Sequence, residues 1–239
     1  MKIIAIIPAR AGSTSIKNKN LVKIKNKSLI SFSIAAAKKS KLIDRVIVST
    51  DSKKIKNVSL ENGAEVPFLR PKKISGFLSK DIEYLKHCIK LLKKEKYTPD
   101  LIVLLRPTTP FREVKTIDKA IQLMIKNKAD SLRSVSVAKE TPFKMWRKKG
   151  KLIKPIFGMK NINKTNYPRQ KLEKFYWQNG YIDIIKPKTI KKYGNELGKK
   201  IIFYEIKTNI FEIDYKYQLK FANKFYQNYK IVERNLYPS

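Results

Sequence analysis

Apolar residues in the first half of the chain follow two different patterns. Patterns typical of strands buried on both faces of a parallel sheet lie at residues 3–7, 45–49 and 101–105, and further short strands are predicted at 65–69 and around 134–137. Apolar residues spaced three or four positions apart predict helices at 29–37, 81–94 and 114–126, and one that Asp51 caps and that ends near Asn62. Strands that alternate with helices in this way predict an α/β domain with a mainly parallel sheet and right-handed crossovers.

The pattern changes after Ala138. Residues 139–175 are polar, aromatic and interrupted by proline, without a clear helical period. We interpret them as an inserted arm or small subdomain, and as a candidate oligomer contact, within a single domain that covers residues 1–239. Strand and helix patterns return at 181–185, at 201–205 and from Asp214 onward. No linker is long enough to separate two domains.

Length and composition indicate a folded protein. The 239 residues are 42% hydrophobic and 10% aromatic, which suffices for one sizeable core. No apolar run approaches the roughly 20 residues that a membrane helix needs, so we expect no membrane insertion. The apolar N-terminal run lacks a small-residue cleavage site, so we do not interpret it as a signal peptide. The single cysteine, Cys88, cannot form an internal disulfide, which fits a cytoplasmic location.

The formal net charge of +35 on its own suggests a nucleic acid or an anionic membrane as partner. The excess is mostly lysine, however, and it is spread along the chain in runs such as 17–20 and 23–27. A nucleic-acid interface concentrates its charge on one face and adds arginine and exposed aromatic residues. We therefore interpret the charge as a compositional bias that attracts anionic substrates, with no specific nucleic-acid partner.

The segment after the first predicted strand carries residues suited to bind phosphate. It covers residues 8–20 and leaves the carboxyl end of the strand, where open α/β sheets bind their ligands. Gly12 and the small Ser13 beside it let backbone N–H groups approach phosphate oxygens. Arg10 and Lys19 add fixed positive charge for a triphosphate. The alternative is an ordinary surface loop, and the spacing of a Walker loop is absent.

Further motifs occur in order along the chain. They are Val48-Ser49-Thr50-Asp51, Leu69-Arg70-Pro71, Leu104-Leu105-Arg106-Pro107-Thr108-Thr109-Pro110-Phe111-Arg112, Tyr167-Pro168-Arg169-Gln170, Gln178-Asn179-Gly180 and Glu212-Ile213-Asp214. Together with segment 8–20, this ordered set resembles the acylneuraminate cytidylyltransferase family, the CMP-sialic acid synthetases. The resemblance extends over nearly the whole chain.

The resemblance implies a Rossmann-like nucleotidyltransferase fold and a cytidylyltransferase activity. Such an enzyme transfers CMP from CTP to the anomeric hydroxyl of an acidic keto sugar and releases pyrophosphate, with Mg²⁺ as cofactor. The sugar is a nonulosonic acid such as N-acetylneuraminic, legionaminic or pseudaminic acid. The resemblance also implies a homodimer whose arms, residues 139–175 here, are exchanged near the active sites.

For the nucleotide, the resemblance implies roles at the front half of the chain. Arg10 and Lys19 would hold the phosphates of CTP, while Asn20 and Arg70 would approach the cytosine and the ribose. The expected nucleotide-binding set is Arg10, Gly12, Ser13, Lys19, Asn20 and Arg70.

For the metal, Asp214 matches the principal metal-binding carboxylate of the family. Glu212 stands two positions earlier, so an extended segment would place both carboxylates on one side, where oxygen ligands suit Mg²⁺. The alternative role of Asp214 is the N-cap of the last helix, which is compatible with metal binding. Asp214, Arg10 and Lys19 are the expected catalytic residues.

For the sugar, Arg169 is the expected partner of the carboxylate, because its planar fork can bind both oxygens, and Gln170 would lie beside it. Lys144 matches a family lysine that reaches into the neighbouring subunit's site. Arg106 and Asn179 complete the expected sugar-binding set. The alternatives are a surface ion pair for Arg169 and a tight turn between strands for Asn179.

The chain departs from the family pattern at several positions. Thr14 stands where the family usually has lysine, which removes a phosphate contact, and Arg106 replaces a glutamine that faces the sugar. The base-contact residue falls in a poorly matching stretch, where Ser79 is a guess. The acceptor can therefore differ from sialic acid. Octulosonate enzymes are an alternative, although their opening motif ends in Lys-Pro where this chain has Lys19-Asn20. The remaining alternative is a basic nucleic-acid- or membrane-surface-binding protein on an inactive nucleotidyltransferase fold.

Overall fold

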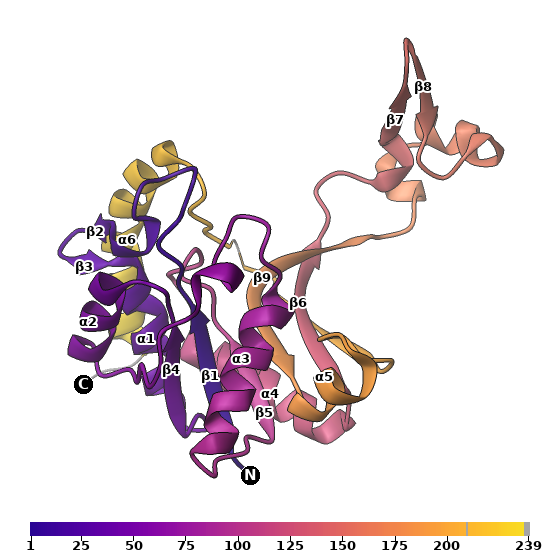
Figure 1. Ribbon diagram of the computed structural model, residues 1–239. Coiled ribbons are helices and arrows are strands. Elements are labelled where there is room, and N and C mark those ends of the chain that lie inside the picture. The colour runs from indigo at the N-terminus through magenta and orange to yellow at the C-terminus, as the bar shows by residue number, and fades with distance from the viewer. Residues whose placement is uncertain (209, 237–239) are drawn as a thin grey trace.

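The computed structural model describes residues 1–208 and 210–236, and its centre is a six-stranded sheet with helices on both faces (Figure 1). The strands are β1 Ile3–Pro8, β4 Arg45–Ser49, β5 Leu101–Leu104, β6 Ser131–Val137, β9 Tyr176–Ile185 and β10 Ile201–Glu205. They lie in the order β10-β6-β9-β5-β1-β4, and only β9 runs against the others. The predicted α/β fold with a mainly parallel sheet is confirmed.

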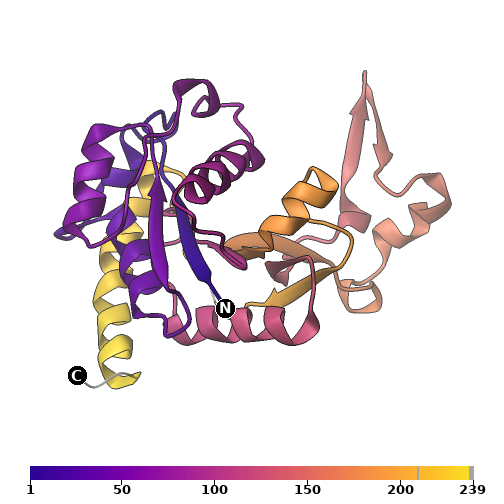
Figure 2. The same cartoon turned by 60° about the horizontal axis from the view of Figure 1, so that its bottom comes forward.

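Two separate cores explain why the strands are continuous apolar runs. The helices are α1 Leu29–Lys39, α2 Lys53–Glu61, α3 Asp81–Lys94, α4 Val114–Asn127 and α5 Pro187–Tyr193 (Figure 2). Ile3, Ala5 and Ile7 of β1 pack with residues of α1, α2 and α4. Ile4 and Ile6, which point to the other face, pack with residues of α3 and α5. β1 is therefore buried on both sides, which removes the alternation of a half-exposed strand.

The last helix, α6 (Lys216–Leu236), packs beside the start of α1 through Phe32, Ala222 and Tyr226. The prediction that Asp214 opens this helix was wrong by two residues. The side chain of Gln218 accepts hydrogen bonds from the backbone N–H groups of Asp214 and Tyr215, so Asp214 does not serve as the cap. The carboxylate of Asp214 is thereby available for another role.

Two local predictions in the first half were wrong as well. Residues 65–69 make only isolated bridges beside β4 rather than a strand, because Pro67 removes a backbone donor from the middle of the segment. The cap of α2 is Ser52, whose hydroxyl accepts from the backbone N–H of Ile55 at 3.3 Å, and not Asp51. The periodicity also missed α5 and a small hairpin, β2 Lys23–Ile24 with β3 Lys27–Ser28.

Residues 139–175 form an arm that projects from the sheet between β6 and β9 (Figure 1). Its outer part is an antiparallel hairpin of β7 (Trp146–Lys149) and β8 (Leu152–Pro155). The arm has a small aromatic core, with ring centroids 4.9 to 5.7 Å apart, made of Phe143, Phe157 and Phe175. Apolar residues elsewhere on it are exposed, Leu152 and Met159 among them.

None of the helices within the described residues is both long and apolar enough to cross a bilayer.

Candidate active site

The loop after β1 is fixed at the carboxyl end of the sheet by hydrogen bonds to the neighbouring strand's end. The backbone N–H of Ala9 donates to the carbonyl of Ser49 at 2.9 Å, and that of Ala11 donates to the carboxylate of Asp51 at 2.8 Å. A side chain at Gly12 would meet no protein atom within 4 Å, so the space over this loop is open to a ligand. The loop therefore has the location that phosphate binding requires, while the backbone N–H groups of Ala9, Ala11 and Ser13 donate to protein oxygens.

Arg10 extends from this loop towards the segment that precedes α3. Its guanidinium donates to the carbonyl of Gly76 and lies 5.7 Å from the centre of the Phe77 ring. Both contacts are with groups that line the same cavity as Arg10. They hold the positive charge of Arg10 at the cavity wall.

Lys19 and Asn20 are buried, because Asn18 takes a left-handed conformation that turns the chain into a short 3₁₀ helix, Lys19–Leu21. The ammonium of Lys19 lies 2.9 Å from Oδ1 of Asp214, almost two hundred residues away in sequence. The side-chain amide of Asn20 donates to the backbone carbonyl of Arg10 at 3.0 Å. The two residues thus connect the phosphate loop to the segment before α6.

Arg70 is 5% exposed and lies behind the end of β4. Its guanidinium donates to the hydroxyl of Ser49 at 3.1 Å and to the Ser49 carbonyl at 2.6 Å, and it lies 4.6 Å from the centre of the Tyr84 ring. Burial lowers the pKa of Arg70 below its ordinary value. A buried guanidinium with fixed partners provides a rigid positive wall rather than a mobile surface charge.

These residues surround a cavity of about 280 Å³, which we call the nucleotide cavity. Its lining is Pro8, Arg10, Ser13, Lys19, Asn20, Arg70, Gly76, Phe77, Ser79, Asp81, Tyr84, Arg106, Pro107 and Thr108. Five of the six residues expected to bind the nucleotide line it, and Gly12 stands in the loop beside it. The concentration of cations gives it the charge that a triphosphate needs.

Arg106, one of the residues expected to bind the sugar, lines the nucleotide cavity and is held between two carboxylates. Its guanidinium lies 2.6 Å from Oδ2 of Asp81 and 2.5 Å from Oδ2 of Asp183. Asp183 is fully buried and also pairs with Arg133 at 2.8 Å. Burial lowers the pKa of Arg106, but the surrounding negative charges, that of Asp183 first, raise it above its ordinary value. The charge of Arg106 is therefore already neutralised by the protein.

Glu212 and Asp214, the residues expected to bind a metal, lie between the two cavities of the structure: Glu212 lines the larger one and Asp214 pairs with Lys19 of the nucleotide cavity. Burial and the charge of Asp214 raise the pKa of Glu212, which indicates that the two carboxylates are close. No group of three or more His, Cys, Asp or Glu side chains that could hold a metal occurs among the described residues. Mg²⁺ commonly takes one or two carboxylates and completes its octahedron with phosphate oxygens and water. The two carboxylates, next to a triphosphate-sized charge cluster, fit such an ion.

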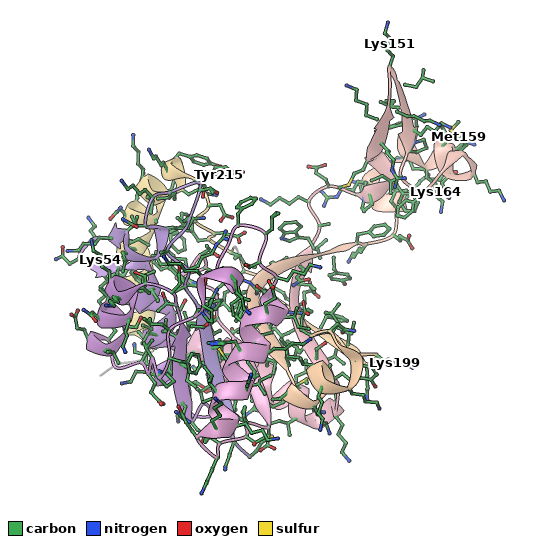
Figure 3. The ribbon with its side chains drawn as sticks, viewed as in Figure 1. Lys54, Lys151, Met159, Lys164, Lys199 and Tyr215 are labelled. Atoms are coloured by element: carbon green, nitrogen blue, oxygen red, sulfur yellow. The ribbon has the colours of Figure 1, made fainter. Side chains whose placement is uncertain are left out.

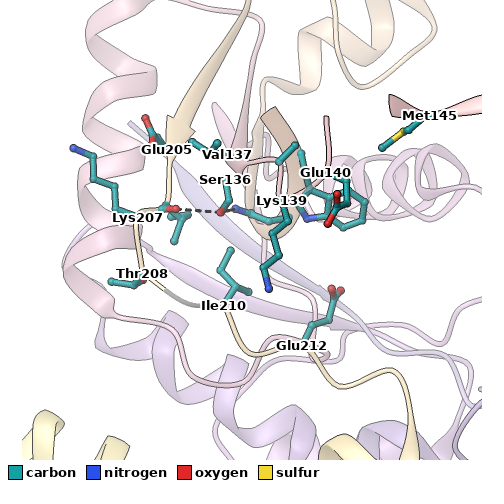
Figure 4. Close-up of a pocket in the computed structure, with 14 residues that line it drawn as sticks. Ser136, Val137, Lys139, Glu140, Met145, Glu205, Lys207, Thr208, Ile210 and Glu212 are labelled. Atoms are coloured by element: carbon teal, nitrogen blue, oxygen red, sulfur yellow. Dashed lines mark hydrogen bonds between the residues drawn. The ribbon is translucent and has the colours of Figure 1, made fainter. Parts of the chain in front are cut away.

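A larger cavity of about 680 Å³ lies at the base of the arm (Figure 4). Figure 4 shows Lys139, Ile210 and Glu212 on its walls, so Glu212 connects this cavity to Asp214 and hence to Lys19. The full lining is Ser136, Val137, Ala138, Lys139, Glu140, Met145, Trp177, Asn179, Glu205, Ile206, Lys207, Thr208, Ile210 and Glu212. We call it the arm-base cavity.

Asn179 is the single expected sugar-binding residue that lines the arm-base cavity, and it is not in a turn. It lies within β9, where a register irregularity opposite β6 accompanies a positive φ of 62° at Gly180. Its amide oxygen accepts from Ser134 at 2.6 Å and its amide nitrogen donates to Ser136 at 2.9 Å. These bonds stabilise the bulged strand at the cavity wall.

The other expected sugar-binding residues lie on the arm. Lys144, Arg169 and Gln170 are all exposed, and none of them lines either cavity of their own chain. Arg169 donates to the backbone carbonyl of Ala138 at 2.8 Å, close to where the arm leaves β6. The structure of one chain therefore brings the nucleotide-binding residues together but leaves the arm residues apart from them.

Positive charge is distributed over the whole molecule. Figure 3 places Lys54 and Lys199 at opposite edges of the body, and Lys151 and Lys164 on the arm. Such a spread is what a compositional bias produces, whereas a nucleic-acid surface gathers its cations along one face.

A cation-lined cavity at the carboxyl ends of the strands of a mainly parallel sheet is a location where α/β proteins bind nucleotides. The cytidylyltransferase family model matches residues 4–236, and the chain belongs to that family. The family that the motifs suggested is thus confirmed, and with it a CTP-dependent nucleotidyltransferase.

The chain is similar to named relatives over most of its length. It is 33% identical over 218 residues to the CMP-N,N'-diacetyllegionaminic acid synthase of Legionella pneumophila, covering 88% of this chain and 90% of that protein. It is also 33% identical over 132 residues to the pseudaminic acid cytidylyltransferase of Campylobacter jejuni, covering 55% and 57%. A solved CMP:2-keto-3-deoxy-manno-octonic acid synthetase in complex with CTP has a TM-score of 0.70 over 95% of this chain and 99% of that one. At 14% identity that likeness shows the fold alone.

Sequence patterns missed one polar residue of the nucleotide cavity, Asp81, and one that lies behind it, Asp183. Asp81 was expected only as the start of a helix, and Asp183 only as part of a strand. A carboxylate in the middle of the apolar run 181–185 was the available signal, because a charge buried in a strand needs a partner. Its partners, Arg106 and Arg133, come from two other strands' ends, which no local pattern connects.

Proposed function

We propose that this protein transfers CMP from CTP to the anomeric hydroxyl of a nonulosonic acid and releases pyrophosphate. The observation that carries the proposal is the pairing of Lys19 with Asp214 at 2.9 Å, because it joins the phosphate loop to the expected metal carboxylate at one point of the cavity wall. In the reaction the sugar hydroxyl attacks the α-phosphorus in line. A new phosphorus–oxygen bond forms as the bond to the pyrophosphate breaks.

The protein contributes mainly position and charge to such a reaction. Arg10, Lys19 and the backbone beside Gly12 and Ser13 would bind the phosphate oxygens and stabilise the charge that develops on the pyrophosphate. The side-chain amide of Asn20 donates to the backbone carbonyl of Arg10 at 3.0 Å, and this hydrogen bond holds the loop in position. Surface lysines, the alternative place for the phosphates, would not be held in fixed positions in this way.

Asp214 and Glu212 would hold Mg²⁺ together with the phosphates of CTP. When bound, the ion neutralises phosphate charge and makes the attacking hydroxyl more acidic. Lys19 would then exchange its contact with Asp214 for one with a phosphate oxygen, which its flexible ammonium allows. The raised pKa of Glu212 reflects burial and the charge of Asp214, the surroundings in which a cation is stabilised.

The arm-base cavity is the proposed acceptor site. It adjoins the metal carboxylates through Glu212, and at about 680 Å³ it is large enough for a nine-carbon sugar. Lys139 and Lys207 on its wall could attract the sugar's carboxylate. Two named relatives, which act on legionaminic and pseudaminic acids by their names, support a nonulosonic acid over an octulosonate.

The arm residues are proposed to act across a homodimer. Lys144, Arg169 and Gln170 face solvent in one chain, and exposed apolar residues such as Leu152 and Met159 lie on the same arm. Such a surface is stabilised when a second copy covers it. In that assembly the arm of one chain would complete the acceptor site of the other.

The buried thiol of Cys88, which forms no disulfide, supports a cytoplasmic setting for the protein.

Pyrophosphate release from CTP and Mg²⁺, measured against a panel of nonulosonic acids with octulosonate as a control, tests the proposal. We expect release with at least one nonulosonic acid, and loss of release when the metal is chelated. Release with octulosonate alone would contradict the acceptor. A folded sample that neither releases pyrophosphate nor binds CTP would contradict the proposed function and favour the charge-driven alternative.

A further inference from the structure

The nucleotide cavity contains a carboxylate that phosphate binding does not explain. Among the described residues that line it, four are cationic, namely Arg10, Lys19, Arg70 and Arg106, and Asp81 alone is acidic. A carboxylate repels a triphosphate at these distances, so its presence in the cavity requires another purpose. The motifs of the sequence assign none to it.

Asp81 is held in a fixed position by its neighbours. It is the first residue of α3, and its Oδ2 lies 2.6 Å from the guanidinium of Arg106. Arg106 is in turn anchored from behind by the buried Asp183 at 2.5 Å. Arg106 cancels the charge of Asp81, so the pair presents a hydrogen-bond acceptor to the cavity without adding net negative charge.

Asp81 lines the nucleotide cavity from the first turn of α3. It belongs to the wall that α3 and the end of β5 form, together with Tyr84 one turn later and Arg70, whose guanidinium lies 4.6 Å from the Tyr84 ring. Arg10 and Ser13 belong to the wall that the loop after β1 forms. Because a carboxylate repels phosphate, the uncharged base is the part of the nucleotide that would lie against Asp81.

We propose that Asp81 selects cytosine by accepting a hydrogen bond from the exocyclic 4-amino group, with Arg106 as the positioning residue that holds it. The inference rests on the proposed function, in which CTP occupies this cavity. Cytosine presents a donor at this position, whereas uracil presents a carbonyl oxygen that the carboxylate would repel. A site that hydrogen-bonds the amino group of its ligand rejects an analogue that lacks this donor, because a polar group is left unpaired.

The test compares the wild-type protein with Asp81→Asn in the binding of CTP and UTP by calorimetry, with no acceptor present. Asparagine keeps the shape of aspartate but can offer its NH₂ group to the uracil carbonyl. We expect the ratio of CTP affinity to UTP affinity to fall about 100-fold. Glu83→Gln is the matched control, because it removes a carboxylate from the same helical turn. The Glu83 carboxylate accepts from the backbone N–H of Lys80, and Glu83 does not line the cavity. The control should leave the ratio unchanged.

A second measurement uses only the wild-type protein and a CTP analogue, so it does not depend on whether the Asp81→Asn variant folds. Pyrimidin-2-one riboside triphosphate is CTP without the 4-amino group, and we expect it to bind about tenfold more weakly than CTP. Equal binding of CTP and this probe, or an unchanged CTP/UTP ratio in a folded Asp81→Asn, would overturn the role of Asp81. Either result would leave the proposed function standing if pyrophosphate release from CTP persists, so the two failures are distinguishable.

Discussion

The nucleotide cavity and the arm differ in how completely one chain builds them. In the cavity, Lys19, Arg70 and Arg106 are each held by a partner that is distant in sequence, at 2.5 to 2.9 Å for the shortest contact of each. On the arm, Lys144 and Arg169 are exposed. The cavity also lies on the sheet, whereas the arm projects away from it (Figure 1).

In the proposed reaction, this difference separates the binding of CTP from the positioning of the acceptor sugar. Cations fixed on a packed sheet lose little entropy when a nucleotide binds, so the CTP half is preorganised. The proposed acceptor half depends in addition on exposed arm side chains, such as Lys144, that lie apart from both cavities of their own chain. On this view a single chain binds CTP, and an assembled pair of chains is needed for transfer.

Replacing the arm should separate the two halves most sharply. The backbone N–H of Ala138 donates to the carbonyl of Phe175 at 2.8 Å, so a two-residue Asn-Gly turn can replace residues 139–174 and close β6 onto β9 as a hairpin. We expect turnover to fall by more than about 10³-fold, because the acceptor loses its positioning groups. CTP affinity, measured by calorimetry, should change less than about threefold because its binding residues are untouched.

A folded arm-less protein that has lost CTP binding would contradict this separation. The thermal unfolding midpoint serves as the control, since the body keeps both of its cores. If the proposed dimer forms through the arm, the arm-less protein should sediment as a monomer and the intact protein as a dimer.

Asp214→Asn changes the proposed metal and nucleotide site and should have the next largest effect on turnover. We expect kcat to fall by about 10²- to 10³-fold, because the variant loses a negative charge that would hold Mg²⁺ beside the phosphates. The acceptor KM should stay near that of the wild type. Glu61→Gln, at the exposed end of α2, is the charge-matched control and should be fully active. Full activity of Asp214→Asn would remove it from the metal site.

Arg169→Ala attacks the acceptor half and should have the smallest effect of the three. We expect the acceptor KM to rise about 30- to 100-fold while the KM for CTP stays constant, because a charged hydrogen-bond partner of the sugar carboxylate is lost. Arg147→Ala removes an equally exposed arginine from β7 of the same arm and should leave both constants unchanged. Equal rises for both substrates would exclude Arg169 from the acceptor site.

The sequence predicted those parts of the fold that local patterns encode. Strands such as 3–7 and 101–105 were recognisable because both faces of the sheet are covered, which leaves no polar position in the run. Segment 65–69 was wrongly predicted as a strand. Its apolar residues suggested one, but Pro67 has no backbone N–H to donate, and only isolated bridges form. Arg10 and Lys19 were found because they stand in one short loop.

Other features depend on contacts between distant segments and left no local pattern. Arg106 was one of the residues expected to bind the sugar, and Asp81 and Asp183 hold it at the nucleotide cavity. Asn179 was open to interpretation as a turn, and the bulge that it stabilises forms only when β9 pairs with β6. Charge networks of this kind become visible only once the strands' ends have been brought together.

The most direct test of the division between the two halves is subunit complementation. Asp214→Asn disables the nucleotide half and Lys144→Ala disables the proposed contribution of the arm, so each variant alone should be nearly inactive. If arms act across the dimer, mixed pairs contain one intact site, and an equal mixture after subunit exchange should recover about a quarter of wild-type activity. A mixture no more active than the two variants measured separately would contradict an acceptor site shared between chains.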